Sequence, residues 1–211
     1  MKNINSLRLV NSKKKDSICK LLFLGYSEVN TALIKKLTEY NCEVWHTSEK
    51  ITSSEGFDIV VSYGYRHILS KDFINKSKAP VINLHISYLP WNRGAHPNFW
   101  SFYECTPCGV TIHLIDEGID TGAIIYQKEI VLDAKINTFS EAYLQLKREI
   151  EKLFLANINS IINKTFPLKI QNGEGSYHSA SDLPENFQGW GSNIKDEISR
   201  LQNQLSGKQG V

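Results

Sequence analysis

The sequence predicts a single α/β domain built on a doubly wound, Rossmann-like and mostly parallel β-sheet. From about Ser17 onward, short apolar runs alternate with helical stretches. Strands separated by helices favour parallel pairing with right-handed crossovers. The length of 211 residues fits one main core. Ligands of such sheets bind beyond the carboxyl ends of the strands, so functional residues are expected there.

Composition and charge exclude several classes of protein. With 41% hydrophobic and 22% charged residues, the chain has the mix of an ordinary globular domain. No run of 18 apolar residues is present, so no membrane span is expected, and the basic first 17 residues lack the apolar centre of a secretory signal. A net charge of +2 is too balanced to indicate nucleic-acid binding. We therefore expect a cytoplasmic protein.

The apolar periodicity gives the expected elements in chain order. A capping box formed by Thr138 and Glu141 opens the second of two expected helices. Strands are expected at 18–24, 42–46, 57–63, 79–84, 108–115 and 123–132, and helices at 29–40 and from 138 to about 163.

Three segments are expected along the chain. Residues 1–17 form an N-terminal extension and residues 18–170 the main domain. Residues 171–211 form a short C-terminal covering segment, since 173–191 is rich in Gly, Ser, Asn and aromatic residues. The last eight or so residues are expected to be frayed.

Four cysteines, at positions 19, 42, 105 and 108, are expected to be reduced thiols in packing roles. Cys105 and Cys108 have C-x-x-C spacing. However, no second ligand pair suggests zinc, and the motif leads into a strand and not a helix.

Polar residues after two of the expected strands could carry chemistry. Asn83 and His85 lie two apart, so their side chains point to one side of a strand end. An amide can donate hydrogen bonds to an oxyanion, and an imidazole can move protons near neutral pH. Asp120, in the loop DEGIDTG, could orient His85 or position a water. A strand-end pair satisfying loop backbone, beside a solvated turn, is the alternative.

Two other features suggest binding only weakly. Gly25 ends the first strand, but the following Tyr-Ser-Glu makes a poor phosphate cradle, so a dinucleotide site is unlikely to lie there. Trp91, Phe99, Trp100 and Trp190 could stack on a ring, although packing is the more usual role of such residues.

Two motifs together carry a specific resemblance. The run NLHISYLPWNRG (83–94), followed by GVTIHLIDEGIDTG (109–122), resembles the catalytic core of the folate-dependent formyltransferases. The resemblance covers about residues 19–132 and implies the formyltransferase fold, with 18–170 as the catalytic domain. It gives Asn83, His85 and Asp120 the places of the family's catalytic Asn, His and Asp. The implied reaction transfers a formyl group from 10-formyltetrahydrofolate to a primary amine without a metal.

The resemblance also implies binding residues. Tyr65, Arg66, His67, Ile68 and Leu69 match the segment that lines the pterin pocket, and Asp116, Glu117, Gly118 and Ile119 would form its other wall. The segments 62–69 and 91–100 are most similar to sugar N-formyltransferases, which act on nucleotide-linked amino sugars. That similarity makes His96, Asn98, Trp100 and Tyr177 candidates for substrate contacts.

The expected substrate is a dTDP-4-amino-4,6-dideoxyhexose used for surface polysaccharide such as the lipopolysaccharide O-antigen. A homodimer is possible, whereas nucleic acid and membrane are not expected as partners. A methionyl-tRNA formyltransferase would carry a basic C-terminal domain that this sequence does not show. Two alternatives stay open: a formyltetrahydrofolate hydrolase, and a non-catalytic module that binds folate or a nucleotide sugar.

Overall fold

The computed structural model describes residues 7–10, 19–40 and 42–208, with only the backbone of 205–208. The strands are β1 Arg8–Leu9, β2 Cys19–Gly25, β3 Cys42–Thr47, β4 Ile59–Tyr63, β5 Val81–His85, β6 Arg93–Gly94, β7 Gly109–Leu114, β8 Ile124–Glu129 and β9 Tyr177–His178. The helices are α1 Leu33–Leu37, α2 Lys71–Lys76, α3 Pro97–Tyr103, α4 Phe139–Ala156, α5 Ile158–Ile162 and α6 Ile194–Lys208, with a 3-10 turn at Ala180–Asp182.

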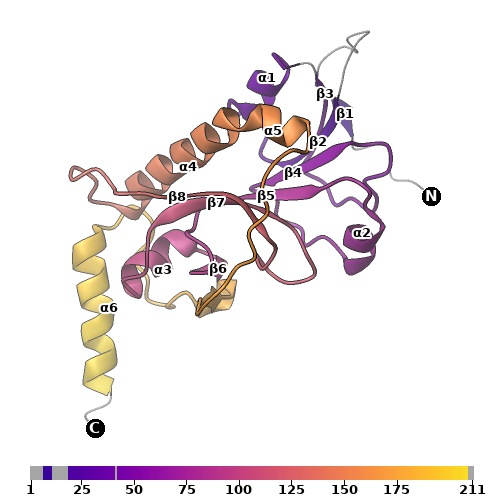
Figure 1. Ribbon diagram of the computed structural model, residues 1–211. Coiled ribbons are helices and arrows are strands. Elements are labelled where there is room, and N and C mark those ends of the chain that lie inside the picture. The colour runs from indigo at the N-terminus through magenta and orange to yellow at the C-terminus, as the bar shows by residue number, and fades with distance from the viewer. Residues whose placement is uncertain (1–6, 11–18, 41, 209–211) are drawn as a thin grey trace. The chain divides into compact units, whose positions relative to one another are not determined.

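The main sheet has seven strands in the order β1-β3-β2-β4-β5-β7-β8 (Figure 1). Strands β3, β2, β4 and β5 pair in parallel, and the short β1 pairs antiparallel with β3. Strand β8 runs antiparallel to β7, because Leu114 N donates to the Ala123 carbonyl oxygen and Ile130 N to that of Cys108. The chain leaves β2 for β3 on one side and returns to β4 on the other, which is the strand order of a doubly wound sheet. The predicted fold class is therefore confirmed.

Contacts between Cα atoms divide the chain into two compact units. The first contains Met1–His85, Ile112–Tyr126 and Phe154–Ile170; the second contains Ile86–Thr111, Gln127–Leu153 and Gln171–Val211. Strands β7 and β8 and helix α4 each contribute residues to both units.

In the first unit, the parallel strands read as apolar runs because both of their faces are covered. Helices α1 and α5 lie on one face of these strands and α2 on the other (Figure 1). Phe73 of α2 is buried with Leu22, Leu24 and Val60 of the sheet. This packing holds the carboxyl ends of β4 and β5 in place next to α2.

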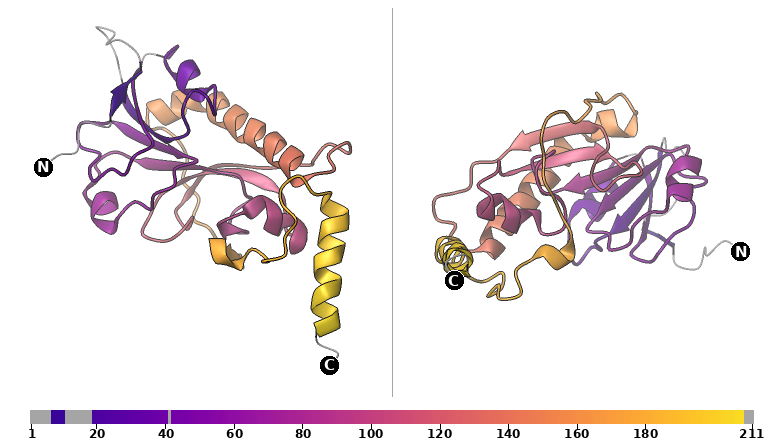
Figure 2. Two further views of the ribbon diagram at one scale, coloured as in Figure 1. Left: turned by 180° about the vertical axis from the view of Figure 1, so that it is seen from behind. Right: turned by 90° about the horizontal axis from the view of Figure 1, so that it is seen from below.

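In the second unit, an aromatic cluster forms the core. Phe99 and Trp100 of α3 pack with Phe139 of α4 and Leu201 of α6. Figure 2 shows α6 as one uninterrupted helix within the segment that the sequence predicted only as a covering segment. The amphipathic spacing of Ile194, Ile198 and Leu201 explains why the helix forms against this core. Helix α6 extends to Lys208, and residues 209–211 lie outside the described residues.

Both expected helices are shorter than the periodicity suggested. The first begins only at Leu33, because Ser27 and Asn30 bond to one another in a turn and the hydroxyl of Thr31 accepts from Leu33 N. The second ends at Ala156, and α5 continues after a break at Asn157. The Thr138–Glu141 capping box is present as reciprocal hydrogen bonds of 2.9 and 3.2 Å.

Candidate active site

Asn83 and His85 lie on strand β5, toward its carboxyl end. Its parallel pairing with β4 matches Ser62 with Asn83 and fixes the register. Because alternate side chains share a face, the amide and the imidazole project to the same side. His85 is 7% exposed and Asn83 is half-buried, so both groups lie in surroundings that strengthen hydrogen bonds.

The loop after β7 is shaped by its own polar groups. Asp116 accepts from Gly118 N at 3.1 Å and from the Thr121 hydroxyl at 2.6 Å. Gly122 lies so close to Leu114 that an added Cβ would lie 1.8 Å from the Leu114 carbonyl oxygen. Asp120 itself has φ 52°, in the left-handed region that Asp tolerates better than most residues. These contacts therefore fix the conformation of the loop and the position of the Asp120 carboxylate.

That carboxylate meets both groups of β5. Asn83 Nδ2 donates to Asp120 Oδ1 at 3.2 Å, and His85 Nδ1 lies 3.7 Å from Asp120 Oδ2. The second distance is too long for a hydrogen bond, but it is short enough for an ion pair with a protonated ring. The structure thus brings together the three residues that sequence reasoning singled out for chemistry.

A fourth residue, His113, joins this cluster. It lies on β7 and is 1% exposed, with Nε2 3.3 Å from Asp120 Oδ1 and 3.3 Å from Asn83 Nδ2. Its Nδ1 lies 2.7 Å from the carbonyl oxygen of Leu114. Since a carbonyl only accepts, Nδ1 carries a proton and Nε2 is the atom that faces the site. Sequence reasoning missed this residue, and its only signal was a histidine within an otherwise apolar strand.

The residues expected around a pterin lie in the same unit as this cluster. Leu69 is buried in the core, while Ile68 is 78% exposed and Ile119 is 38% exposed. Tyr65 is fixed by its hydroxyl, which donates to the Glu49 carbonyl oxygen and accepts from Ile51 N.

Glu117, in one expected wall of the pterin site, contacts the helix that follows the other wall. Its carboxylate accepts from Asn75 Nδ2 at 3.0 Å and pairs with Lys71 at 2.9 Å, both on α2, which begins two residues after Leu69. These contacts hold the pKa of Glu117 below its usual range. Exposed apolar side chains beside held loop backbone suit a flat heteroaromatic ring, so the residues present fit a folate.

The four expected substrate contacts lie in the second unit. Asn98 is 3% exposed and donates to the Phe139 carbonyl oxygen, and the Trp100 ring stacks on His178 at 3.8 Å. Tyr177, on β9, is 55% exposed. His96 caps α3 at φ 54° and contacts the ring of Trp190.

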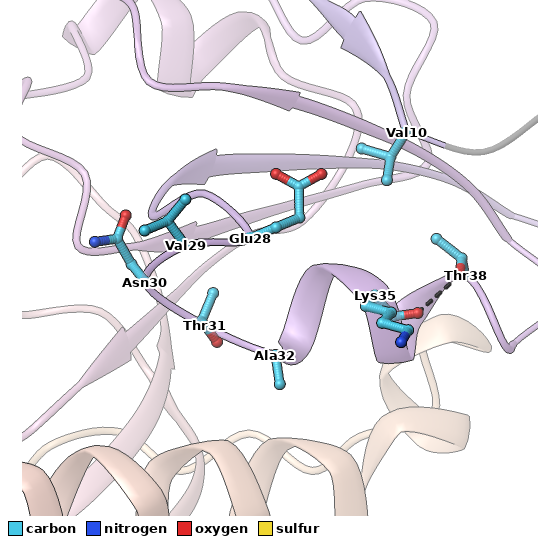
Figure 3. A pocket seen from close by; sticks show the side chains of 8 residues that line it. All are labelled: Val10, Glu28, Val29, Asn30, Thr31, Ala32, Lys35 and Thr38. Carbon is cyan, nitrogen blue, oxygen red and sulfur yellow. Dashed lines mark hydrogen bonds between the residues drawn. The ribbon is translucent and has the colours of Figure 1, made fainter.

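A cleft of about 520 Å³ lies beside α1 in the first unit (Figure 3). Glu28 lines it and is held by Arg8 through two bonds of 2.5 and 2.7 Å, which lower the pKa of Glu28. A carboxylate in the loop after β2 disfavours phosphate at this place.

A buried imidazole with a partly buried amide and carboxylate, at the carboxyl end of a parallel strand in a mostly parallel sheet, defines an α/β protein whose site suits acyl-group chemistry. The sequence profile of the formyl transferase family matches residues 7–158, and the chain belongs to this family. The formyltransferase PseJ from Anoxybacillus kamchatkensis is 39% identical, with a TM-score of 0.77 over 86% of this chain and 98% of that one. That structure holds UDP-4,6-dideoxy-4-formamido-L-AltNAc and tetrahydrofolate.

Curated relatives include enzymes with different acceptors. A methionyl-tRNA formyltransferase from Thermodesulfovibrio yellowstonii is 40% identical over 57% of this chain, and a GDP-perosamine N-formyltransferase from Brucella melitensis is 32% identical over 60%. The chain spans 39% and 48% of the lengths of these two proteins. An N-formyltransferase from Helicobacter canadensis, 24% identical with a TM-score of 0.65 over 81% of this chain and 76% of that one, shares the fold.

Proposed function

We propose that the chain is a folate-dependent N-formyltransferase that acts on a nucleotide-linked amino sugar, with 10-formyltetrahydrofolate as the formyl donor. The observation that carries this proposal is the cluster of Asn83, His85 and Asp120 in a chain of the formyl transferase family. A sugar acceptor is supported by the similarity to PseJ, which extends over 98% of that chain.

The cluster supplies the groups that amine formylation requires. The amine nitrogen bonds to the formyl carbon, the bond from that carbon to the folate nitrogen then breaks, and tetrahydrofolate leaves with a proton on that nitrogen. Asn83 donates through Nδ2 to the oxygen on which negative charge develops, and a protonated His85 is a second donor. Asp120 lies against both side chains, so it holds them in place and accepts the proton that the amine must lose.

Folate contacts are assigned to two segments of the first unit. Residues 65–69 offer backbone groups and the exposed Ile68, and residues 116–119 offer the exposed Ile119. Glu117 bonds the second segment to α2, the helix that follows the first segment, so part of the order of this region is present before folate binds.

The proposed acceptor is a 4-amino-4,6-dideoxyhexose on a nucleoside diphosphate, formylated in the cytoplasm for surface polysaccharide. The ligand of PseJ favours UDP as the nucleotide carrier. The sequence resemblance suggested dTDP, so sugars linked to either nucleotide are tested below. Tyr177 and His96 are the better candidates for sugar or nucleotide contacts, since Asn98 and Trp100 are buried.

Incubation with 10-formyltetrahydrofolate and a panel of UDP-, dTDP- and GDP-linked amino sugars tests the proposal. We expect a formylated sugar by mass spectrometry together with an equal amount of tetrahydrofolate. A bound sugar at about 100 times its Kd also stabilises the fold by roughly 2.7 kcal/mol, visible as a thermal shift. Formate release without any formylated sugar would overturn the proposal in favour of a hydrolase, and formylation of methionyl-tRNA alone would replace the acceptor.

A further inference from the structure

Two cysteines lie directly opposite one another in the sheet. Cys19 opens β2 and Cys42 opens β3, and the parallel pairing matches the two residues in register. Neighbouring strands lie about 4.7–4.9 Å apart, which is within the Cα separation of about 4.4–6.8 Å that a disulfide spans. The register therefore satisfies the first geometric condition for a covalent link.

The two thiols also lie on the same face of the sheet. The residues that follow them, Lys20 and Glu43, meet on the opposite face as an ion pair at 3.5 Å. Four residues further along, Phe23 and His46 meet on the thiol face with ring centroids 6.4 Å apart. Contacts on both faces agree with this register, so the Cβ atoms of Cys19 and Cys42 project together.

The surroundings keep this pair in contact and out of water. Cys19 is 3% exposed and Cys42 is fully buried. A hydrogen bond between the two thiols, and then burial, raises the pKa of Cys19 well above its usual range. The Asp58 carboxylate accepts from Lys20 N at 2.8 Å and lies 3.9 Å from Lys164, and both of these side chains are about half exposed, so Cys19 lies next to surface residues.

The pair lies away from the reacting groups along the strands. Cys19 and Cys42 begin their strands, whereas Asn83 and His85 lie toward the carboxyl end of a parallel strand. The thiols therefore take no direct part in the proposed reaction.

We propose that Cys19 and Cys42 form an oxidation site at which the two thiols close to a disulfide between β2 and β3. With a peroxide as oxidant, the sulfur of one thiol attacks a peroxide oxygen and gives its proton to the departing oxygen, so that a sulfenic acid forms and water leaves. The second thiol then displaces the sulfenic oxygen as another water, and a sulfur–sulfur bond forms. Two thiols are oxidised, one peroxide is reduced and two waters leave.

The link is a reversible one. Registered Cβ atoms in a sheet lie nearer 5 Å than the approximately 3.8 Å of a relaxed disulfide, so closing the bond draws the strands together and stores strain. A strained disulfide is reduced more readily than a structural one. It closes a loop of roughly 24 residues that contains α1, which still constrains the unfolded chain.

Cys105 and Cys108 are the competing pair in the chain. Cys105 is exposed at φ 54° after the end of α3, and burial raises the pKa of Cys108. The carboxyl end of a helix disfavours a thiolate, so this pair gains none of the activation of a C-x-x-C at a helix start.

The test uses the full chain with both competing cysteines replaced, C105S/C108S. After hydrogen peroxide treatment of the folded protein, alkylation in denaturant and mass spectrometry, we expect the loss of two hydrogens, a peptide joining Cys19 to Cys42, and reversal by glutathione. Adding C42S to this background removes the loss, and adding C19A instead repeats that result if C42S folds poorly. The oxidised form is expected to melt roughly 5 °C higher. The proposal would be overturned if Cys19 and Cys42 were both alkylated after the peroxide treatment, because both thiols would then still be free. Oxidation of either thiol to a sulfinic or sulfonic acid would also overturn it.

Discussion

His113 Nε2 lies 3.3 Å from the Asp120 carboxylate, while its Nδ1 is held 2.7 Å from the Leu114 carbonyl oxygen. Asp120 therefore rests between a β7 histidine and the β5 pair, and its backbone is in the left-handed region. Such a conformation persists only where its surroundings hold it. We infer that His113 helps to hold the Asp120 carboxylate in position.

We predict that His113→Leu lowers kcat by about 10- to 100-fold and changes the KM values little, because a positioning residue acts through Asp120. Steady-state kinetics with the amino-sugar acceptor, together with a pH profile of kcat, checks this. His113→Gln should recover part of kcat, since an amide still reaches Asp120. A fall in melting temperature with unchanged kcat in the remaining folded enzyme would show that the residue has only a structural role.

Asp120→Asn should reduce transfer by at least about 100- to 1000-fold while the fold stays intact. Asn tolerates the left-handed region as well as Asp does, so the loop keeps its path and only the charge is lost. His85→Ala should have an effect of the same size. Single-turnover assays beside circular dichroism separate chemistry from folding, and transfer within tenfold of wild type in either variant would contradict the assignment.

Asn83→Ala should lower kcat by about 100- to 1000-fold, the usual cost of one lost oxyanion donor. Folate affinity, measured by titration with 5-formyltetrahydrofolate, should change far less, because the donor acts on charge that develops during the reaction. Ser62→Ala, at the registered position on β4, is the matched control and should leave kcat near wild type. Turnover near wild type in the Asn83 variant would remove the oxyanion role.

Glu117→Ala should raise KM for the folate by roughly 2- to 5-fold with a smaller effect on kcat, since it frees residues 116–119 from α2. Asp72→Ala is the matched control, because it breaks a 2.7 Å ion pair with Lys76 on the same helix without touching the loop. Equal effects of the two substitutions would mean that α2, and not the loop, sets folate affinity.

The parts of the fold and of the site that could be predicted from the sequence are those that depend on residues close together in the chain. Apolar runs located the sheet strands, and two dense motifs located Asn83, His85 and Asp120. His113 was hidden because a histidine in a buried strand resembles a core residue, and Glu117 looked like part of a solvated turn until α2 supplied its partners. The pairing of β6 with β9 joins Arg93 to Tyr177 across a long stretch of chain, which periodicity cannot reveal. Helix α6 forms on an aromatic core assembled from three distant segments.

Low pH should weaken the hydrogen bonds by which the Glu197 carboxylate holds α6. The Glu197 carboxylate is 2% exposed and accepts from Arg200 Nε and Nη2 and from Gln188 N at 2.7–2.9 Å. The Arg200 guanidinium holds the pKa of Glu197 below its usual range. A carboxyl whose pKa is lower in the folded state contributes stability above its unfolded pKa of about 4.3, and loses that contribution as pH falls through the folded value.

Glu197→Gln should therefore lower the melting temperature by about 3–6 °C at pH 7, since it weakens a buried charge-assisted contact. The difference from wild type should shrink as pH falls below about 4, where wild type also loses the charge. Thermal melts from pH 7 to pH 3 measure this difference. Glu185→Gln, on the exposed part of the same unit, should shift the melt little at any pH. A difference between wild type and Glu197→Gln that is as large at pH 3 as at pH 7 would mean that the side chain stabilises α6 through packing and not through its charge.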